Sequence, residues 1–301
     1  MHQSLFSKKP LAYLIASMAL LNSLPATATV IDGLTAQTSA QAGTNPAVTA
    51  GPNASTTYAS ASSSANDGQS QAWASSFGYN VGPYGAGGGG DGVFDSTGQF
   101  QRQWDITNDS GVAQNYSFNF FIYYGGMSAY DNGAGGTGYA EYMVNILRDG
   151  STSLFSSAAK IESNGTLTTS GTTLNGASQF GSSYSWGGTY FTIDLGVLNP
   201  GDSTSVQNDL VGHAFGNYGF SGTCGGYGYG DGEGNGNFES AVAGNGNCTG
   251  SSYAFLGDPD SLNTTPIPGI GITSHAVPEP ATLALLGIGL AAFGLRRRPR
   301  K

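Results

Sequence analysis

The stretch QFQRQWDITNDSGVAQNYSFNFFIYY, residues 99–124, alternates apolar and polar side chains on both sides of a turn. In its first half, one side of an extended strand would carry Phe100, Arg102, Trp104 and Ile106. Turn-forming residues follow at 108–111, and the second half then places an apolar or aromatic side chain at every second position from 116 to 124. We expect a β-hairpin here, and we expect it to supply the core of the fold.

Three further pairs of short runs are separated by turn chemistry such as Asn66-Asp67-Gly68. They predict hairpins of residues 56–64 with 71–77, of 142–148 with 154–161 and of 190–195 with 204–211, and a strand at 253–256 that closes a sheet. Gly makes up 49 of the 301 residues, a composition that favours strands and turns over helices. We therefore predict an all-β fold, an antiparallel β-sandwich over residues 54–260 with Gly-rich loops, of which a jelly roll is one form.

The charge of the chain differs between its ends and its middle. The whole sequence has 10 Lys and Arg against 19 Asp and Glu. Residues 29–276 keep only Arg102, Arg148 and Lys160 as cations, against 18 acidic residues, which gives a net charge of −15. Such a surface repels phosphate backbones and anionic lipid, so we expect no nucleic-acid partner. An acidic surface is compatible with solubility outside the cell, with bound divalent cations and with contact to neutral polysaccharide.

The N-terminus has the pattern of a secretory signal peptide. Lys8 and Lys9 precede an apolar run over residues 11–24, and Ala26-Thr27-Ala28 supplies the small residues of a cleavage site. The run is too short for an ordinary membrane span. We predict a signal peptide over residues 1–28.

Two segments beside the expected sandwich lack a usable period. Residues 29–53 are mostly small and polar, and we interpret them as a flexible leader of the mature protein. Residues 261–276 are interpreted as a linker to the C-terminal segment.

The C-terminus combines a helix-breaking motif, an apolar run and a basic cluster. The motif consists of Val277, Pro278, Glu279 and Pro280. Residues 281–295 carry no charge, and as a transmembrane helix they would span about 22 Å against a hydrocarbon core of roughly 30 Å, which is short for a permanent anchor. The basic cluster begins with Arg296, Arg297 and Arg298, and would hold this end on the cytoplasmic side.

Residues 277–301 resemble the PEP-CTERM sorting signal of exported proteins of Gram-negative bacteria. The resemblance implies that the tail anchors the protein transiently in the inner membrane. It also implies that an exosortase, a membrane-embedded processing enzyme, recognises Pro278-Glu279-Pro280 and removes the tail. The alternatives are a plain C-terminal anchor or a buried apolar helix.

Cys224 and Cys248 bracket a Gly-rich insertion over residues 224–248. An even number of cysteines in an exported protein favours a disulfide between them over metal ligation, and two free thiols are the alternative. Inside the insertion, oxygen-bearing side chains are closely spaced around Gly236, namely Asp231, Glu233, Asn235 and Glu239. This spacing resembles the opening of a Ca²⁺ loop, but the twelfth position of an EF-hand holds Val242. The alternative is a solvated, disulfide-held loop without a cofactor.

The motifs of common enzymes receive little support. Gly85, Gly87 and Gly90 have dinucleotide-binding spacing, but no apolar strand precedes them, so we expect a flexible loop. His213 is the one histidine that we place inside the fold, and no Gly-x-Ser-x-Gly elbow accompanies it. A glycosidase with paired carboxylates stays open, because such pairs are formed by the fold and are invisible in the sequence.

The sequence therefore predicts an exported, non-enzymatic β-sandwich that acts as a structural or interaction protein at the cell surface or in the extracellular polysaccharide matrix, with an exosortase as its processing partner. The alternative is a secreted carbohydrate-active module. This would be either a carbohydrate-binding domain that uses calcium or a weakly recognisable glycosidase. In that case aromatic residues such as Tyr227 and Tyr229 would stack on sugar rings.

Overall fold

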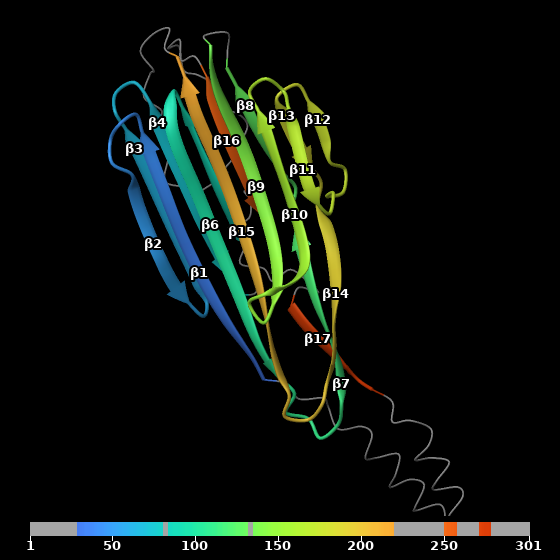
Figure 1. The fold of residues 1–301 in the computed structure, drawn as a ribbon. Helices are drawn as coiled ribbons and strands as arrows, with labels where there is room; N and C mark the ends of the chain where they lie inside the picture. Colours follow the sequence, from blue (N-terminus) through green and yellow to red (C-terminus); the bar gives the residue numbers. More distant parts are fainter. Residues whose placement is uncertain (1–28, 81–83, 132–134, 220–249, 258–270, 278–301) are drawn as a thin grey trace, which may run out of the picture.

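The computed structural model describes residues 29–80, 84–131, 135–219, 250–257 and 271–277. These residues form antiparallel strands and no helix, and the strands form three sheets that pack as a sandwich (Figure 1). The predicted all-β fold class is confirmed.

Sheet A has seven strands. Their order is β11 (Leu167–Gly171), β10 (Thr152–Glu162), β9 (Gly136–Arg148), β15 (Ser203–Tyr218), β6 (Val93–Thr107), β1 (Thr29–Ala42) and β2 (Val48–Ser55). Sheet B also has seven. Their order is β12 (Ser178–Phe180), β13 (Ser183–Trp186), β8 (Gly125–Tyr130), β16 (Ser251–Gly257), β5 (Tyr84–Asp91), β4 (Gln71–Tyr79) and β3 (Tyr58–Asn66). Sheet C contains β14 (Thr189–Leu198), β7 (Gln114–Ile122) and β17 (Gly271–Ala276), in that order.

Sheet A and sheet C enclose an aromatic core. The ring of Trp104, on β6, lies with its centroid 4.6 Å from that of Phe118 on β7. Phe120 on β7 lies 5.3 Å from Phe155 on β10 in an edge-to-face arrangement. These rings are nearly or completely buried. Large aromatic side chains therefore fill the space between these two sheets with few atoms exposed.

Sheet A and sheet B approach each other through glycine and other small residues. A Cβ added at Gly98 on β6 would lie 2.5 Å from the carbonyl oxygen of Gly87 on β5. At Gly212 on β15 it would lie 2.7 Å from the carbonyl oxygen of Ala86. Because no side chain fits at these positions, the backbones of the two sheets are in direct contact there.

Several sequence predictions are confirmed. Residues of β3 and β4 form the expected hairpin, and its turn is held by the Asp67 carboxylate, which accepts hydrogen bonds from the backbone N–H groups of Gln69 and Ser70. The hairpin of β9 with β10 is also present. Phe100, Arg102, Trp104 and Ile106 all point inward and are buried, as expected.

Two predicted hairpins are wrong in their pairing. Strands β6 and β7 belong to sheets A and C and do not pair, and the same is true of β14 and β15. The turns between them carry the chain across the sandwich, and Asn108 joins the two crossings. Its N–H donates to the carbonyl oxygen of Asp202, its carbonyl accepts from the N–H of Gly201, and its amide donates to the Leu198 carbonyl. Tyr124, expected on the core face, is exposed beyond the end of β7.

Three segments that we expected to be irregular are strands. The predicted leader 29–53 contains β1, which lies between β6 and β2 in sheet A. Its inward positions include Ala36, Ala40 and Ala42, whose small side chains fit the close contact with sheet B and give little hydrophobic signal. The predicted linker 261–276 ends in β17, so His275 also lies in the fold. The predicted loop around Gly85, Gly87 and Gly90 is the buried strand β5, where glycines allow the close approach of sheet A.

Candidate functional site

The outer face of sheet C carries a row of aromatic side chains. Strand β7 turns Phe118, Phe120 and Ile122 into the core, so Phe121 points outward. Its register partner on β14 is Tyr190, and the two ring centroids lie 4.3 Å apart. Tyr123 packs edge-on against Phe121 at 4.7 Å. The side chain of Tyr190 is 62% exposed, so much of this ring is open to a ligand.

A hydrogen-bonded row of polar side chains lies beside these rings. The hydroxyl of Thr192 donates to the amide oxygen of Asn119 at 2.8 Å, and the amide nitrogen of Asn119 donates to the hydroxyl of Thr273 at 3.1 Å. The row therefore joins all three strands of sheet C. We call this surface, made of Phe121, Tyr123, Tyr190, Thr192, Asn119 and Thr273, the sheet C platform.

The platform combines the two features that recognise a sugar ring. The apolar C–H face of a pyranose packs against an aromatic ring, and its hydroxyl groups need hydrogen-bond donors and acceptors beside that ring. The Phe121 ring lies close against the backbone of Gly188, where an added Cβ would be only 2.6 Å from it. The nearby Asp194 lies on the same face of β14. Its carboxylate accepts a hydrogen bond from the N–H of Gly196, two residues along the same strand.

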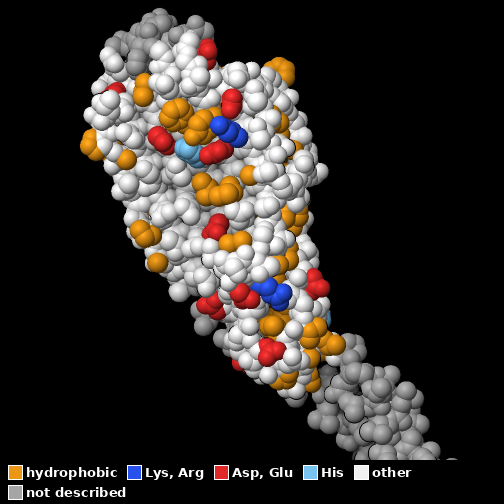
Figure 2. Space-filling view, in the orientation of Figure 1, with side chains coloured by type: hydrophobic (Ala, Val, Ile, Leu, Met, Phe, Trp, Pro, Cys, Tyr) orange, Lys and Arg blue, Asp and Glu red, His pale blue; other side chains and the backbone are white. Residues whose placement is uncertain are grey.

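A charged cluster lies on the outer face of sheet A. The Nδ1 atom of His213 on β15 is 2.7 Å from the Glu141 carboxylate on β9, and its Nε2 atom is 3.0 Å from the Asp95 carboxylate on β6. Tyr139 packs edge-on against the imidazole and also stacks with Phe215. Figure 2 shows this cluster as a pale blue histidine between red carboxylates and beside orange aromatic side chains.

The carboxylates determine the charge of His213. Burial alone would lower the pKa of His213, but the hydrogen bonds to Asp95 and Glu141 raise it to about 9. The hydrogen bond with His213 is in turn the main reason that the pKa of Glu141 is lowered. An imidazolium whose two nitrogens both donate to carboxylates has no free lone pair, so His213 is not poised to act as a general base.

A shallow groove of about 270 Å³ continues from this cluster toward β11. Met143, Ala158 and Val211 contribute apolar surface to it, and Lys160, Thr168 and Ser170 are among its polar lining residues. The ammonium group of Lys160 lies over the Tyr139 ring, 4.1 Å from its centroid. The aromatic residue among those that line the groove is Tyr142, whose side chain is buried, so the groove offers a ligand less aromatic surface than the sheet C platform does.

Most of the site residues predicted from the sequence lie outside the described residues. These are Cys224, Cys248, Asp231, Glu233, Asn235, Glu239, Tyr227 and Tyr229, the motif residues Pro278, Glu279 and Pro280, and Arg296, Arg297 and Arg298. Only Val277 of the motif is described, and its N–H donates to the carbonyl oxygen of Ala113 at 3.0 Å. The calcium ligands, the disulfide and the sorting contacts therefore stay predictions.

Two negative findings concern the described residues. No three His, Cys, Asp or Glu side chains among them are grouped in a way that could hold a metal ion. None of them belongs to a helix long and apolar enough to cross a membrane.

The sequence analysis missed both outer-face surfaces. The platform had a visible signal, since Phe121 and Tyr123 interrupt the polar positions of an otherwise alternating strand. The His213 cluster had none, because Asp95, Glu141 and His213 come from three strands that are neighbours only in the folded sheet.

Comparison with known protein families identifies the C-terminal segment. Residues 276–298 match the model of the PEP-CTERM protein-sorting motif. No curated protein and no solved structure matches the chain. The match covers the last residue of β17 and the segment that follows it, so the resemblance seen in the sequence is confirmed for this segment and does not extend to the sandwich.

Proposed function

We propose that this exported, exosortase-processed chain is a non-enzymatic structural or interaction protein of the cell surface or extracellular matrix of a Gram-negative bacterium. The observation that carries the proposal is the sorting motif at residues 276–298, which begins at the last residue of a strand of the folded sandwich. A processing signal joined to a folded domain delivers that domain outside the cell in its finished form.

The sandwich itself supports a structural role. Sheets A and B meet through backbone contacts at glycine, and sheets A and C meet through a buried aromatic core. Such interiors are close-packed and deform little. The one histidine cluster described on the outer faces is an ion-pair network in which each charged group is held by another. These features favour a rigid display surface over a site that must exchange protons.

The sorting part of the proposal is tested by following tail removal in cells. Replacing Glu279 with Ala, or Arg296, Arg297 and Arg298 together with Gln, should leave export intact while unprocessed protein accumulates in the inner membrane. Glu162→Ala removes an acidic side chain that pairs with Lys160 at the surface, and this variant should be processed like the wild type. Normal tail removal in both motif variants would contradict the assignment.

A second candidate function is binding of carbohydrate, and the sheet C platform is the observation that favours it. Its exposed Tyr190 and the polar row of Thr192, Asn119 and Thr273 match the needs of a sugar ring. Asp194 places a negative charge on the same face as the platform. The mature region as a whole carries a net charge of −15. A neutral polysaccharide is therefore favoured over an acidic one, which this charge would repel.

The binding function is tested with purified mature protein on a panel of neutral and acidic glycans, with calcium and with chelator. Tyr190→Ala and Thr192→Val should each weaken binding to a neutral glycan, by roughly 1 kcal/mol for the stacking contact. Phe180→Ala is the matched control, because Phe180 is an aromatic residue that is 90% exposed on β12, outside the platform. Equal binding by Tyr190→Ala and wild type would remove the platform as the site. Release of new reducing ends during the assay would favour a glycosidase.

A further inference from the structure

The two ends of the mature region lie at the same end of the sandwich. Strand β1 begins with Thr29 opposite Thr107, the last residue of β6. Strand β17 ends with Ala276 opposite Gln114, the first residue of β7. Residues 107 and 114 are joined by the short turn that crosses the sandwich, so both predicted export segments are attached at this end. Figure 1 shows β17 ending at the same end of the sandwich as the start of β7. We call this end, formed by residues 108–113, 199–202 and the end of β17, the tail pole.

The covalent chain places the tail pole close to the predicted membrane segment. Three residues, Pro278, Glu279 and Pro280, separate Val277 from the apolar run that begins at Ala281. Even a fully extended chain covers only about 14 Å over these four residue steps. While the tail is present, the sandwich is therefore held directly against the membrane, with its tail pole facing the lipid.

In the folded domain, the backbone that precedes the motif is not free to be bound by the processing enzyme. A peptidase binds its substrate as an extended segment on both sides of the recognised residues, largely through backbone hydrogen bonds. In the folded domain the N–H of Val277 is donated to Ala113, and residues 271–276 are paired with β7. The backbone that precedes the motif is therefore already occupied by the sandwich.

Strand β17 is held less firmly than the strand on the opposite side of β7. It has six residues at the edge of sheet C, and Ile272 is its side chain that packs against the core. Thr273, His275 and Ala276 are exposed. By contrast, β14 buries Leu195 and Leu198 and adds Phe191 to the aromatic core. Edge strands with little buried apolar surface open at low free-energy cost, before the rest of a domain unfolds.

We propose that β17 is the segment that the membrane-embedded processing enzyme takes up. In the anchored precursor β17 leaves β7 and is bound by the enzyme together with the motif, and it pairs with β7 again after the tail has been removed. The edge of β7 and the tail pole then form the surface of the sandwich that faces the enzyme. This inference rests on the proposed exosortase processing.

A disulfide across the β7–β17 pair tests the inference. Ser117 and Thr273 are register partners on the outer face of sheet C, and neighbouring antiparallel strands lie within the Cα separation that a disulfide spans. The substitutions Ser117→Cys and Thr273→Cys are made in a Cys224→Ser, Cys248→Ser background, so that the new cysteines have only each other as partners. The matched control is Ser62→Cys with Ser75→Cys, which joins β3 to β4 on the outer face of sheet B.

Processing is followed in membranes that contain the enzyme, and mass spectrometry of non-reduced precursor verifies both disulfides. We expect the β7–β17 disulfide to prevent most tail removal and added reductant to restore it, while the β3–β4 disulfide leaves the rate at that of the cysteine-free background. Ile272→Ala, which removes the buried contact of β17 without a cross-link, should be processed at least as fast as the wild type.

Two outcomes separate the possible failures. Removal of the tail at the control rate while the β7–β17 disulfide is intact would overturn the role of β17. Absence of tail removal in the wild type, or equal removal in wild type and Glu279→Ala, would overturn the exosortase assignment on which the inference rests.

Discussion

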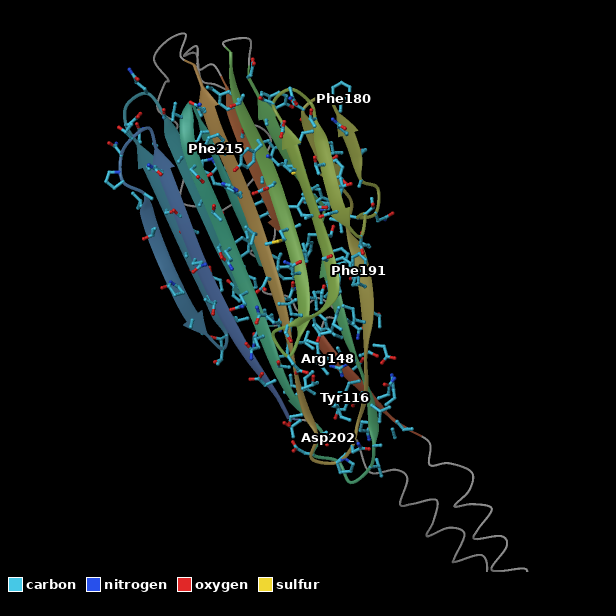
Figure 3. All side chains as sticks on the ribbon, in the orientation of Figure 1. Tyr116, Arg148, Phe180, Phe191, Asp202 and Phe215 are labelled. Atoms are coloured by element: carbon cyan, nitrogen blue, oxygen red, sulfur yellow. The ribbon has the colours of Figure 1, made fainter. Side chains whose placement is uncertain are left out.

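At the scale of single residues, the core contains a buried hydroxyl group without a hydrogen-bond partner among the described residues. Tyr116 is completely buried on β7, and its hydroxyl group has no hydrogen-bond partner among the described residues. Figure 3 shows Tyr116 toward the tail pole. Tyr218, at the other end of sheet A, is almost as deeply buried, but its hydroxyl lies 2.7 Å from that of Ser252. The buried hydroxyl of Tyr218 therefore has a hydrogen bond that compensates for its loss of water, whereas the hydroxyl of Tyr116 has none among the described residues.

Replacing each tyrosine with Phe should have opposite effects. Tyr116→Phe removes an unpaired buried polar group and should raise the free energy of unfolding by about 1 kcal/mol. Tyr218→Phe leaves the buried hydroxyl of Ser252 without this partner and should lower it by about 1 kcal/mol. Thermal unfolding of the mature protein measures both changes. A loss of stability in Tyr116→Phe similar to that in Tyr218→Phe would show that the Tyr116 hydroxyl is satisfied in solution.

The His213 cluster makes stability depend on pH. The pKa of His213 is raised to about 9 by the hydrogen bonds to Asp95 and Glu141, which exceed the opposing effect of burial, against 6.5 in an unfolded chain. A raised pKa means that the folded state binds the proton more tightly, so this stabilisation is fully present below pH 6.5 and is lost as the pH rises to about 9. Tyr139 and Lys160 are the other titratable groups in contact around the cluster.

We therefore expect the melting temperature to fall between pH 6.5 and pH 9, by an amount that corresponds to roughly 1 kcal/mol at this partly exposed site. In His213→Gln, which cannot be protonated, this part of the pH dependence should disappear. Lys160→Gln serves as the control, because it removes a neighbouring charge but leaves both histidine hydrogen bonds in place. A pH profile of His213→Gln that is parallel to the wild type would assign the dependence to other groups.

At the scale of strands and sheets, glycine determines how closely sheets A and B approach. Gly98 on β6 and Gly33 on β1 lie in the same sheet, but only Gly98 faces sheet B. A Cβ at Gly98 would overlap backbone atoms of Ser75 and Gly87, whereas a Cβ at Gly33 would have no atom within 4 Å. The backbone of two packed sheets cannot move aside locally, so the overlap would have to separate the sheets.

Gly98→Ala should lower the free energy of unfolding by about 3 kcal/mol, the upper end of the 1 to 3 kcal/mol that overpacking typically costs, because the overlap is with backbone atoms. Gly33→Ala should be neutral or slightly stabilising, because Gly weakens a strand interior. Chemical denaturation of the two variants compares them directly. Similar stability of the two variants would mean that sheets A and B are far enough apart to leave room for a methyl group at position 98.

The alternation of side chains predicted many of the strands, but it predicted the pairing correctly in only two of the four expected hairpins, β3 with β4 and β9 with β10. The pattern from Phe100 to Ile106 correctly assigned the inward face of β6. It cannot distinguish a hairpin turn from a turn that crosses between sheets, because Asn108 and its neighbours have the same turn chemistry in both cases. Strand β1 was missed because the inward positions after Leu34 hold only Ala36, Thr38, Ala40 and Ala42, whose small side chains give a weak hydrophobic alternation.

The candidate sites were predictable to different degrees for a similar reason. The sorting motif is a contiguous segment, so its sequence was sufficient to identify it. The sheet C platform and the His213 cluster are formed by side chains from three strands each, and only the sheet order brings them together.

At the scale of the whole molecule, the distribution of charge opposes folding. The mature region carries 18 acidic residues and only Arg102, Arg148 and Lys160 as cations. Attractive pairs such as Lys160 with Glu162, at 3.4 Å, are few and lie at the surface, where each contributes less than about 1 kcal/mol. The remaining acidic groups repel one another in the folded state, and they are farther apart in the unfolded chain. Repulsion between the acidic groups should therefore lower the free energy of unfolding by more than the ion pairs raise it.

Salt should consequently stabilise the mature protein. The screening length falls from about 30 Å at 0.01 M salt to about 10 Å at 0.1 M, which weakens long-range repulsion more than it weakens contacts at 3 to 4 Å. We expect the melting temperature to rise over this range in NaCl, and to rise equally in MgCl₂ and CaCl₂ of the same ionic strength if screening alone operates. An additional rise in CaCl₂ that is lost in Asp231→Ala would reveal the predicted calcium loop, because a ligand of the folded state adds its own stabilisation. A melting temperature that falls with NaCl would show instead that the ion pairs, including those of His213, outweigh the repulsion.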